Sequence, residues 1–355
     1  MTGSFKLIKP KPLKPGDNIA VLSPSTGLPS VFPHIYESGI RNLNALGFNV
    51  VEFPTARMDI DEVFNNPKLR AQDLNRAFSD SNIHGIIATI GGNDSARVLK
   101  YLDPDMIKAN PKLFMGFSDF TAVSAFVNQL GLVTFNGPSI MAGFSQLHNL
   151  PAVYQRYLKS FLFEPWHNFT FPTFESYSDG YPDWAIASNV GLLHANKSND
   201  GPRLLQSAGS QQKSVTGQLF GGCIEVLEML KGTPYWPAPD FWQGKILFFE
   251  TSEEKPSIDY VKYWLRNYGV MGVFEQISGL LFGRARDYSN EEKAKLDDVI
   301  LSVIKGEFGC NNLTVVSNLD FGHTDPQLII PQGVTAEIDS QTKQIRLLES
   351  PFDLG

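Results

Sequence analysis

Short apolar runs alternate with amphipathic stretches over the first 130 residues. The runs predict strands at residues 19–22, 48–53, 84–90 and 112–117. The stretches that follow them predict helices at residues 34–46, 68–78, from 95 onward and 119–130. Strands that alternate with helices at this spacing are typical of right-handed βαβ units on a parallel sheet. The pattern therefore predicts an α/β domain over residues 1–164.

The rest of the chain divides into two further parts. Residues 165–215 are rich in aromatic residues and show no clear periodicity, so we expect a long, partly ordered connection between domains. A second domain is expected over residues 216–355. Its pattern predicts helices at 225–230 and 257–268, strands at 245–249, 277–282 and 313–316, and a hairpin within 334–348.

Composition narrows the class of protein. Hydrophobic residues make up 42% of the 355 residues and charged residues 19%, which is typical of a globular chain. The net charge of −7 and the lack of a long basic run argue against a nucleic-acid partner. No apolar stretch is long enough to span a membrane, and the first 16 residues do not resemble a signal peptide. We expect a cytoplasmic protein.

Neither the cysteines nor the histidines suggest a metal or disulfide scaffold. Cys223 and Cys310 are the two cysteines, and they do not form a CxxC pair. The six histidines form no HxxxH pair either, so no metal site is expected. The phosphate-binding patterns GxGxxG and GxxxxGK[ST] are both missing.

Three loops that follow predicted strands are rich in small polar residues. They lie at residues 23–27, 91–95 and 116–119. In a parallel sheet the carboxyl ends of the strands meet at one edge, where ligands bind. We therefore expect the chemistry of the amino-terminal domain at this edge.

Ser118 lies at one of these strand-to-helix turns, in Gly116-Phe-Ser-Asp119. A sharp bend of this kind exposes a serine Oγ beside the free N–H groups of a helix start. The alternative is that Ser118 only caps the helix. The second glycine of the hydrolase elbow is absent.

Glu250 and His323 also follow apolar strands. Glu250 ends the run Ile246-Leu-Phe-Phe-Glu250, and His323 lies in a polar loop between Gly322 and Pro326. Taken singly, they could be a capping acid and a surface histidine. Taken with Ser118, they supply a nucleophile, an orienting carboxylate and a general base in the order Ser, Glu, His.

The sequence also resembles a known family through seven motifs that run in order along the chain. They are Gly91-Gly-Asn-Asp94, Gly116-Phe-Ser-Asp119, Thr134-Phe-Asn-Gly-Pro138, Gly217-Gln-Leu-Phe-Gly-Gly222, Lys245-Ile-Leu-Phe-Phe-Glu250, Gly279-Leu-Leu-Phe-Gly283 and Phe321-Gly-His-Thr-Asp-Pro326. These motifs are similar to those of the serine peptidases of the LD-carboxypeptidase and microcin C immunity family. The resemblance implies a Rossmann- or flavodoxin-like amino-terminal domain with a parallel sheet and a smaller β-rich carboxy-terminal domain. It also implies a triad shared between the domains, and commonly a homodimer.

The resemblance assigns roles to individual residues. Ser118 matches the nucleophile, His323 the base and Glu250 the partner of the base. Gly92 and Asp119 match the backbone amides of an oxyanion hole. The Gly-Gly-Asn form of the first loop and the Trp-bearing connection look more like the microcin-immunity branch.

Candidate substrate contacts are Asn93, Trp184 and Cys223. Cys223 stands where that branch leads us to expect asparagine, which leaves the choice of substrate open. Trp184, in Tyr181-Pro-Asp-Trp184, could stack on a nucleobase or could equally be a core or dimer-interface anchor.

The resulting prediction is a serine peptidase or amidase that needs no cofactor and cleaves an amide bond next to a carboxylate-bearing residue. An aminoacyl-nucleotide of the microcin C kind is the preferred substrate. One alternative is an LD-carboxypeptidase that removes the terminal D-alanine from muropeptides. A different class, a non-catalytic two-domain ligand-binding protein, would share the parallel sheets. An α/β-hydrolase esterase is disfavoured because the second elbow glycine and an HGGG-type loop are missing.

Overall fold

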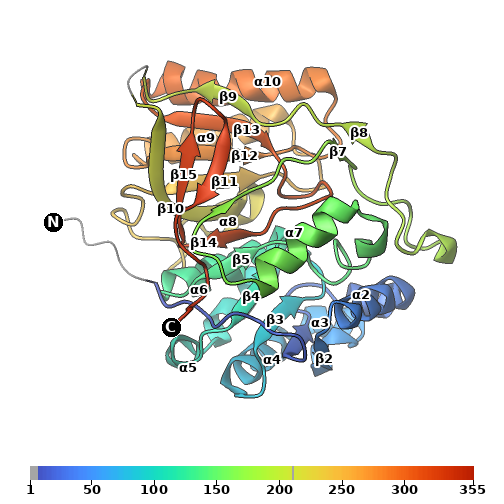
Figure 1. Ribbon diagram of the computed structural model, residues 1–355. Coiled ribbons are helices and arrows are strands. Elements are labelled where there is room, and N and C mark those ends of the chain that lie inside the picture. Colours follow the sequence, from blue (N-terminus) through green and yellow to red (C-terminus); the bar gives the residue numbers. More distant parts are fainter. Residues whose placement is uncertain (1–6, 210–211) are drawn as a thin grey trace.

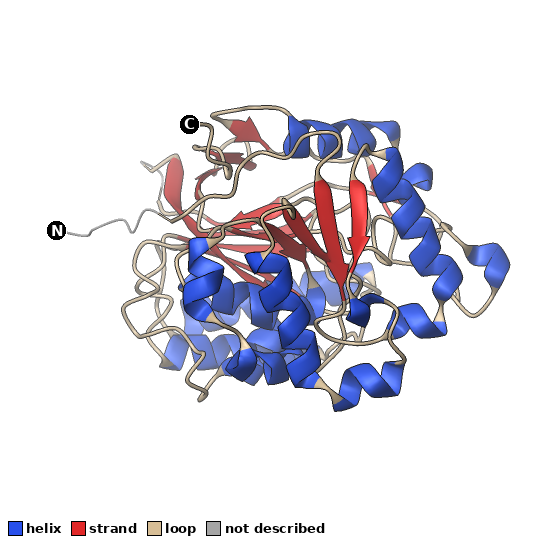
Figure 2. Cartoon of the chain, turned by 90° about the horizontal axis from the view of Figure 1, so that it is seen from below, coloured by secondary structure: helices blue, strands red, loops and turns tan. Residues whose placement is uncertain are grey.

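The computed structural model describes residues 7–209 and 212–355. It contains an amino-terminal sheet, in the lower half of Figure 1, and a carboxy-terminal sheet, in the upper half. Figure 2 shows the strands in the interior of the molecule and most of the helices around them. The expected α/β class with a parallel sheet in the amino-terminal region and a second sheet in the carboxy-terminal region is confirmed.

The amino-terminal sheet has the strand order β14-β5-β4-β3-β1-β2. Its parallel strands are β1 (Asn18–Leu22), β2 (Asn49–Glu52), β3 (Gly85–Ala88), β4 (Leu113–Gly116) and β5 (Thr134–Asn136). The order β2-β1-β3-β4-β5 is flavodoxin-like, and its direction reverses between β1 and β3. The loops that leave β1 and β3 therefore flank the crevice where ligands bind in such sheets.

Helices cover both faces of this sheet, which is why β3 and β4 are buried throughout. They are α1 (Leu28–Val31), α2 (Pro33–Ala45), α3 (Ile60–Asn65), α4 (Pro67–Ser79), α5 (Pro104–Ala109), α6 (Thr121–Gln129) and α7 (Ala152–Phe163). Short 3₁₀ turns lie at Pro54–Ala56, Ser95–Tyr101, Ser118–Phe120, Leu147–Asn149 and Ala187–Asn189. Proline at the first position of α2, α4 and α5 presets the helical φ.

The helix expected from residue 95 is a 3₁₀ turn, Ser95–Tyr101, followed by a separate helix α5. Asp103 ends the turn, because its side chain accepts from the N–H of Met106 and Pro104 begins the new helix. The helix expected over 119–130 likewise begins as the 3₁₀ turn Ser118–Phe120 before α6.

The carboxy-terminal sheet has the order β6-β16-β15-β10-β11-β12-β13-β9. Its parallel centre is formed by β10 (Ser214–Cys223), β11 (Ile246–Glu250), β12 (Gly279–Gly283) and β13 (Thr314–Leu319). The antiparallel flanks are β6 (Phe169–Thr170), β9 (Arg203–Gln206), β15 (Thr335–Asp339) and β16 (Gln344–Leu347). Its helices are α8 (Ile224–Leu230), α9 (Ile258–Val270), α10 (Asn290–Leu301) and the π-helical turn Ser302–Glu307. The capping box of Ser289 and Glu292 begins α10.

The aromatic-rich segment at 165–215 is more structured than its sequence indicates. It supplies the edge strands β6 and β9, and the short antiparallel pair β7 (Ser176–Tyr177) and β8 (Lys197–Ser198). Phe171, Phe174 and Tyr177 are buried. The segment therefore packs along the body of the protein as part of the fold.

The two halves of the chain are joined by strand pairing and by a common buried cluster. Strand β14 (Ile330–Gln332) comes from the carboxy-terminal part of the chain and pairs antiparallel with β5 of the amino-terminal sheet. Phe120 and Val123 belong to the same buried cluster as Leu227 and Leu247. Among the residues that the structure describes, no helix is both long and apolar enough to cross a membrane.

Candidate active site

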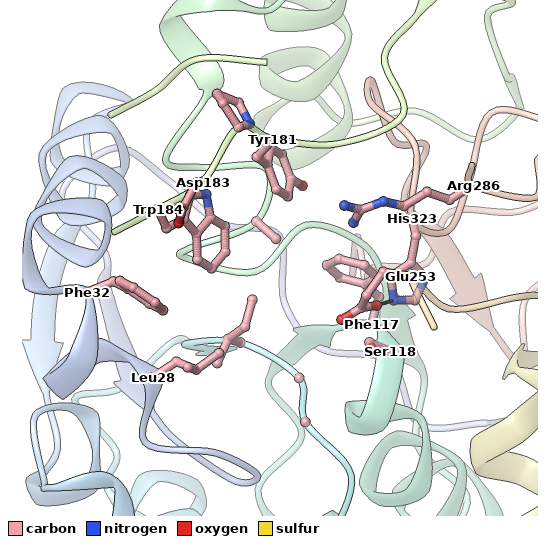
Figure 3. Close-up of a pocket in the computed structure, with 15 residues that line it drawn as sticks. Leu28, Phe32, Phe117, Ser118, Tyr181, Asp183, Trp184, Glu253, Arg286 and His323 are labelled. Atoms are coloured by element: carbon pink, nitrogen blue, oxygen red, sulfur yellow. Dashed lines mark ion pairs between the residues drawn. The ribbon is translucent and has the colours of Figure 1, made fainter. Parts of the chain in front are cut away.

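A cavity of about 340 Å³ opens where the two halves of the chain meet. Loops that follow β3, β4, β12 and β13 line it together with Tyr181–Trp184. Figure 3 shows Ser118, Glu253, His323 and Arg286 on one side and Phe32, Tyr181 and Trp184 on the other. A volume of this order suits a small-molecule ligand.

Ser118 takes an unusual backbone conformation for a residue with a side chain. Its φ is +60°, a left-handed value that costs energy outside glycine. The N-cap position of the following turn is Phe117, so Ser118 is not the capping residue. A Cβ on Gly91 would lie 2.8 Å from Ser118 Cβ and 2.9 Å from Ser118 Oγ. Gly91 therefore leaves the space that this turn needs, in the manner of a nucleophile elbow.

The Asp119 side chain ties the three polar loops together, a role that sequence reasoning did not assign to it. Its Oδ2 accepts hydrogen bonds from Ser25 Oγ and from the N–H groups of Asp94 (3.0 Å) and Ser95 (2.8 Å). Its carbonyl accepts from Ser95 Oγ at 2.6 Å. Burial raises the pKa of this carboxyl, and these donors oppose the shift. Asp119 thereby fixes the loop that carries Gly92.

A buried arginine supports the same loops. Arg70 donates through Nη1 (2.8 Å) and Nη2 (3.0 Å) to the Asp94 carboxylate. Its Nη1 also donates to the carbonyls of Pro24 and Ser25, at 3.1 and 2.8 Å. A bidentate guanidinium–carboxylate pair is geometrically specific. The loops after β1 and β3 are thus held to each other beside the crevice.

The structure brings Glu250 and His323 into contact. His323 Nδ1 lies 2.5 Å from Glu250 Oε2, and both side chains are buried. A Cβ on Gly322 would lie 2.7 Å from Glu250 Cβ, so glycine at this position lets the two loops approach. The ring of Phe117 meets the imidazole edge-on at 4.9 Å. Glu250 therefore fixes the orientation of a ring that lines the same cavity as Ser118.

A second carboxylate, missed at the sequence level, contacts the other ring nitrogen. Glu253 Oε2 forms an ion pair with His323 Nε2 at 2.9 Å, and the Glu253 side chain is 52% exposed. Burial alone would lower the pKa of His323, but Glu250 and Glu253 outweigh it and raise that pKa to about 10. The imidazolium in turn lowers the pKa of Glu253 to about 2, against the effect of burial. The two carboxylates therefore favour the protonated form of His323.

Arg286 is a further charged residue of the cavity that the sequence analysis did not identify. It follows β12, lines the cavity, and lies 5.7 Å from the centre of the Tyr181 ring. Its Nε forms an ion pair with Asp287 at 3.2 Å. The rule that found Glu250, a polar residue beyond an apolar strand, would also have found Arg286 in Gly283-Arg-Ala-Arg286.

The proposed substrate contacts fall in different places. Trp184 lines the cavity, stacks on Tyr181 with ring centres 5.5 Å apart, and meets Phe32 edge-on at 6.0 Å. Gly92 also lines the cavity, whereas Asn93 is an exposed loop residue.

Cys223 is fully buried, its N–H donates to Thr121 Oγ1 at 3.0 Å, and its thiol contacts Glu225. Burial raises the pKa of that thiol well above its usual range. In the described part of the chain, Asn93 and Cys223 lie outside the cavity lining.

Comparison with known proteins agrees with this fold. A family model described as the LD-carboxypeptidase N-terminal domain matches residues 19–137, and the model for the corresponding C-terminal domain matches residues 216–338. A Vibrio cholerae relative with carboxypeptidase in its name is 28% identical over 342 residues, covering 95% of this chain and 96% of its own. The microcin C7 self-immunity protein MccF of Escherichia coli is also 28% identical over 342 residues, with 95% of each chain covered.

Solved structures of similar proteins extend the comparison. An MccF-like protein from Streptococcus pneumoniae in complex with AMP has a TM-score of 0.82 and 30% identity, covering 94% of this chain and 99% of its own. MccF in complex with aspartyl sulfamoyl adenosine has a TM-score of 0.84 and 26% identity, covering 98% and 100%.

The fold and these matches define a hydrolase of the peptidase class. The chain belongs to the serine peptidase family of LD-carboxypeptidases and microcin C immunity proteins.

Proposed function

We propose that the protein hydrolyses an amide bond through a triad of Ser118, His323 and Glu250. Ser118 Oγ attacks the carbonyl, and His323 Nε2 takes the serine proton and returns it to the leaving amine. Glu250 holds the imidazolium through Nδ1. The N–H groups of Gly92 and Asp119 receive the oxyanion. The observation that carries the proposal is that Ser118, on a strained turn, and the His323–Glu250 pair come from opposite halves of the chain and meet at one cavity.

The preferred substrate is an aminoacyl-nucleotide whose acyl residue carries a carboxylate, as in detoxification of a microcin C-like compound. Similar proteins are named in complexes with AMP and aspartyl sulfamoyl adenosine. In this chain the cavity has two distinct walls. The Tyr181–Trp184 stack offers a flat aromatic face for a nucleobase, and Arg286 offers a cation for a carboxylate.

A second candidate is removal of the terminal D-alanine from muropeptides, because both family models are described as LD-carboxypeptidase domains. The two substrates make different demands on the cavity. A nucleobase would use the aromatic wall, whereas a short peptide would depend mainly on Arg286 and the triad. The expected homodimer and the expected cytoplasmic location remain predictions.

One experiment separates the candidates from a non-catalytic binding protein. A fluorophosphonate probe, applied over a pH series from neutral to alkaline, should label the wild-type protein at Ser118 and should not label Ser118→Ala. The same wild-type sample is then assayed on aspartyl sulfamoyl adenosine and on a muropeptide tetrapeptide, and hydrolysis is measured by mass spectrometry. Faster turnover of the nucleotide supports the preferred substrate, and faster release of D-alanine supports the second. Absence of labelling at Ser118 at every pH of the series would remove the hydrolase proposal.

A further inference from the structure

Glu253 contacts His323 Nε2, the ring nitrogen that the proposed reaction needs as a proton acceptor. A general base in a serine hydrolase accepts the serine proton at the imidazole nitrogen that faces the hydroxyl. Here Glu250 binds Nδ1 and Glu253 lies 2.9 Å from Nε2, so both ring nitrogens face carboxylates. Carboxylates at both ring nitrogens favour the doubly protonated imidazolium, which has no free lone pair to accept the serine proton. Glu253 must therefore leave Nε2 before Ser118 can react.

The surroundings of Glu253 allow such a movement. Its backbone lies in a hydrogen-bonded turn. Glu225 accepts from the N–H (2.9 Å) and Oγ (2.7 Å) of Ser252. The N–H groups of Glu254 and Lys255 donate to Ser252 Oγ (3.2 Å) and to the Ser252 carbonyl (3.3 Å). The Glu253 side chain, in contrast, is half exposed and points into the cavity, as Figure 3 shows. Because the backbone is held and the Glu253 side chain is half exposed, the carboxylate can turn from the His323 imidazolium to another cation in the cavity.

We propose that Glu253 is a specificity-determining residue that binds the free α-ammonium group of the substrate's acyl residue and thereby releases His323. The inference rests on the proposed hydrolase function. In an aminoacyl group the ammonium is only two bonds from the carbonyl carbon that Ser118 attacks, so it must lie close to His323. In a peptidyl group the same nitrogen is acylated and carries no charge. Glu253 therefore favours an aminoacyl substrate over a peptidyl one.

The proton balance is simple. When Glu253 turns to the incoming ammonium, the His323 imidazolium keeps only Glu250 as its carboxylate partner. It then releases the Nε2 proton to water, and the freed lone pair accepts the Ser118 hydroxyl proton. The other charged or titratable groups around this pair are Arg286, Asp325, Tyr181 and Glu225. Burial raises the pKa of Asp325 to about 6, so its charge also changes near neutral pH.

The first test needs no natural substrate. We expect fluorophosphonate labelling of Ser118 in Glu253→Gln to begin at a lower pH than in the wild type, because the neutral amide no longer holds His323 protonated. Glu254→Gln, which makes the same charge change at the next residue, should label with the wild-type pH profile. An unchanged profile in Glu253→Gln would show that the ion pair does not restrain the base.

The second test measures recognition of the ammonium. Aspartyl sulfamoyl adenosine and its deamino analogue, succinyl sulfamoyl adenosine, are titrated calorimetrically into Ser118→Ala, which cannot cleave them. We expect the amine to improve affinity by about tenfold or more, as for a charge-assisted hydrogen bond. The difference should vanish in Ser118→Ala/Glu253→Gln and persist in Ser118→Ala/Glu254→Gln.

Failure of Ser118→Ala to distinguish the two analogues, or to bind either, would overturn the ammonium assignment. Fluorophosphonate labelling of the wild-type protein is independent of that result. A protein that labels at Ser118 but ignores the amine remains a hydrolase with a different substrate preference, so the two proposals fail separately.

Discussion

At the scale of single residues, three side chains should act as one unit. Ser118→Ala and His323→Ala should each remove most of the hydrolytic rate, up to about 10⁶-fold, and Glu250→Ala should cost less. The double variant Ser118→Ala/His323→Ala should be little slower than either single variant, because the attack needs both groups together. Steady-state kinetics on whichever substrate the wild type cleaves measures this. Losses that multiply in the double variant would contradict a shared step.

The charges around His323 should also make stability depend on pH. The pKa of His323 is raised from 6.5 to about 10, so its contribution to stability is complete below pH 6.5 and is lost as the pH rises through about 10. The pKa of Glu253 is lowered from 4.5 to about 2, so its contribution is complete above pH 4.5 and is lost as the pH falls through about 2. The excess melting temperature of the wild type over Glu253→Gln should therefore be largest between pH 4.5 and 6.5.

Differential scanning fluorimetry across the pH range checks this expectation. Glu254→Gln provides the control, because Glu254 is an exposed neighbour on the same loop. A difference between wild type and Glu253→Gln that stays constant up to pH 11 would mean that the ion pair does not contribute to stability.

The sequence predicted the identity of Ser118, Glu250 and His323 as candidates because each follows an apolar strand. It could not predict that Glu253 faces His323 Nε2, because that contact depends on how two loops separated by 70 residues lie against each other. The same limit applies to Asp119, whose side chain joins loops from three strands. Cys223, expected to contact substrate, is enclosed beside Thr121 and Glu225, since strand β10 carries it inward.

At the scale of elements, the strand-to-helix turn at Ser118 depends on the loop after β3. Gly91→Ala should displace Ser118, because the new methyl group would lie within 3 Å of its Cβ and Oγ. We expect a loss of about a hundredfold in kcat/KM with a nearly unchanged circular dichroism spectrum. Gly306→Ala is a suitable control, since nothing lies within 4 Å of a Cβ there. Full activity in Gly91→Ala would show that the turn tolerates a displaced serine.

The aromatic wall of the cavity gives a prediction about the substrate. Trp184→Ala should weaken binding of aspartyl sulfamoyl adenosine to Ser118→Ala by about tenfold to a hundredfold, because a stacked base is worth roughly 1–3 kcal/mol. Trp184 is only partly buried, so the melting temperature should fall little. Isothermal titration calorimetry and thermal melting measure the two effects.

Trp166 is the matched comparison for Trp184. It belongs to the same aromatic-rich segment but packs on Phe161 and Phe169, at 5.5 and 4.7 Å between ring centres. Trp166→Ala should therefore lower the melting temperature more than it lowers affinity. If Trp184→Ala also lowers the melting temperature more than the affinity, Trp184 is a structural anchor. The aromatic side of the cavity would then no longer support a nucleotide substrate.

Strands with a clear apolar pattern of their own can be predicted from the sequence, whereas strands that depend on a distant partner cannot. The parallel strands β1, β3 and β4 are continuous apolar runs, so their sequence alone identifies them within a few residues. Strands β6 and β9 are short, and they pair with β16 and β13, which lie more than 100 residues further along the chain. No local pattern records such a partner. The segment at 165–215 therefore looks irregular in the sequence although it is built into the sheet.

At the scale of the whole molecule, the two halves are joined through their interiors. Strand β14 extends the amino-terminal sheet, and helix α6 packs against β10 and α8 of the other half. The ring of Phe352, near the carboxyl end, stacks on Phe135 of β5 at 5.5 Å. Separating the halves would expose these apolar contacts and the edge of β5.

This shared interior predicts how the chain unfolds. Differential scanning calorimetry should show one transition, with a calorimetric enthalpy close to the van't Hoff enthalpy, because neither half keeps a complete core without the other. Phe352→Ala should lower the temperature of that single transition without splitting it, since a buried aromatic ring removed from a core costs about 3–5 kcal/mol. Tyr260→Ala, at an exposed aromatic residue, should change the temperature little. Two resolved transitions in the wild-type protein would show instead that the halves fold independently, and the triad would then lie between two separable units.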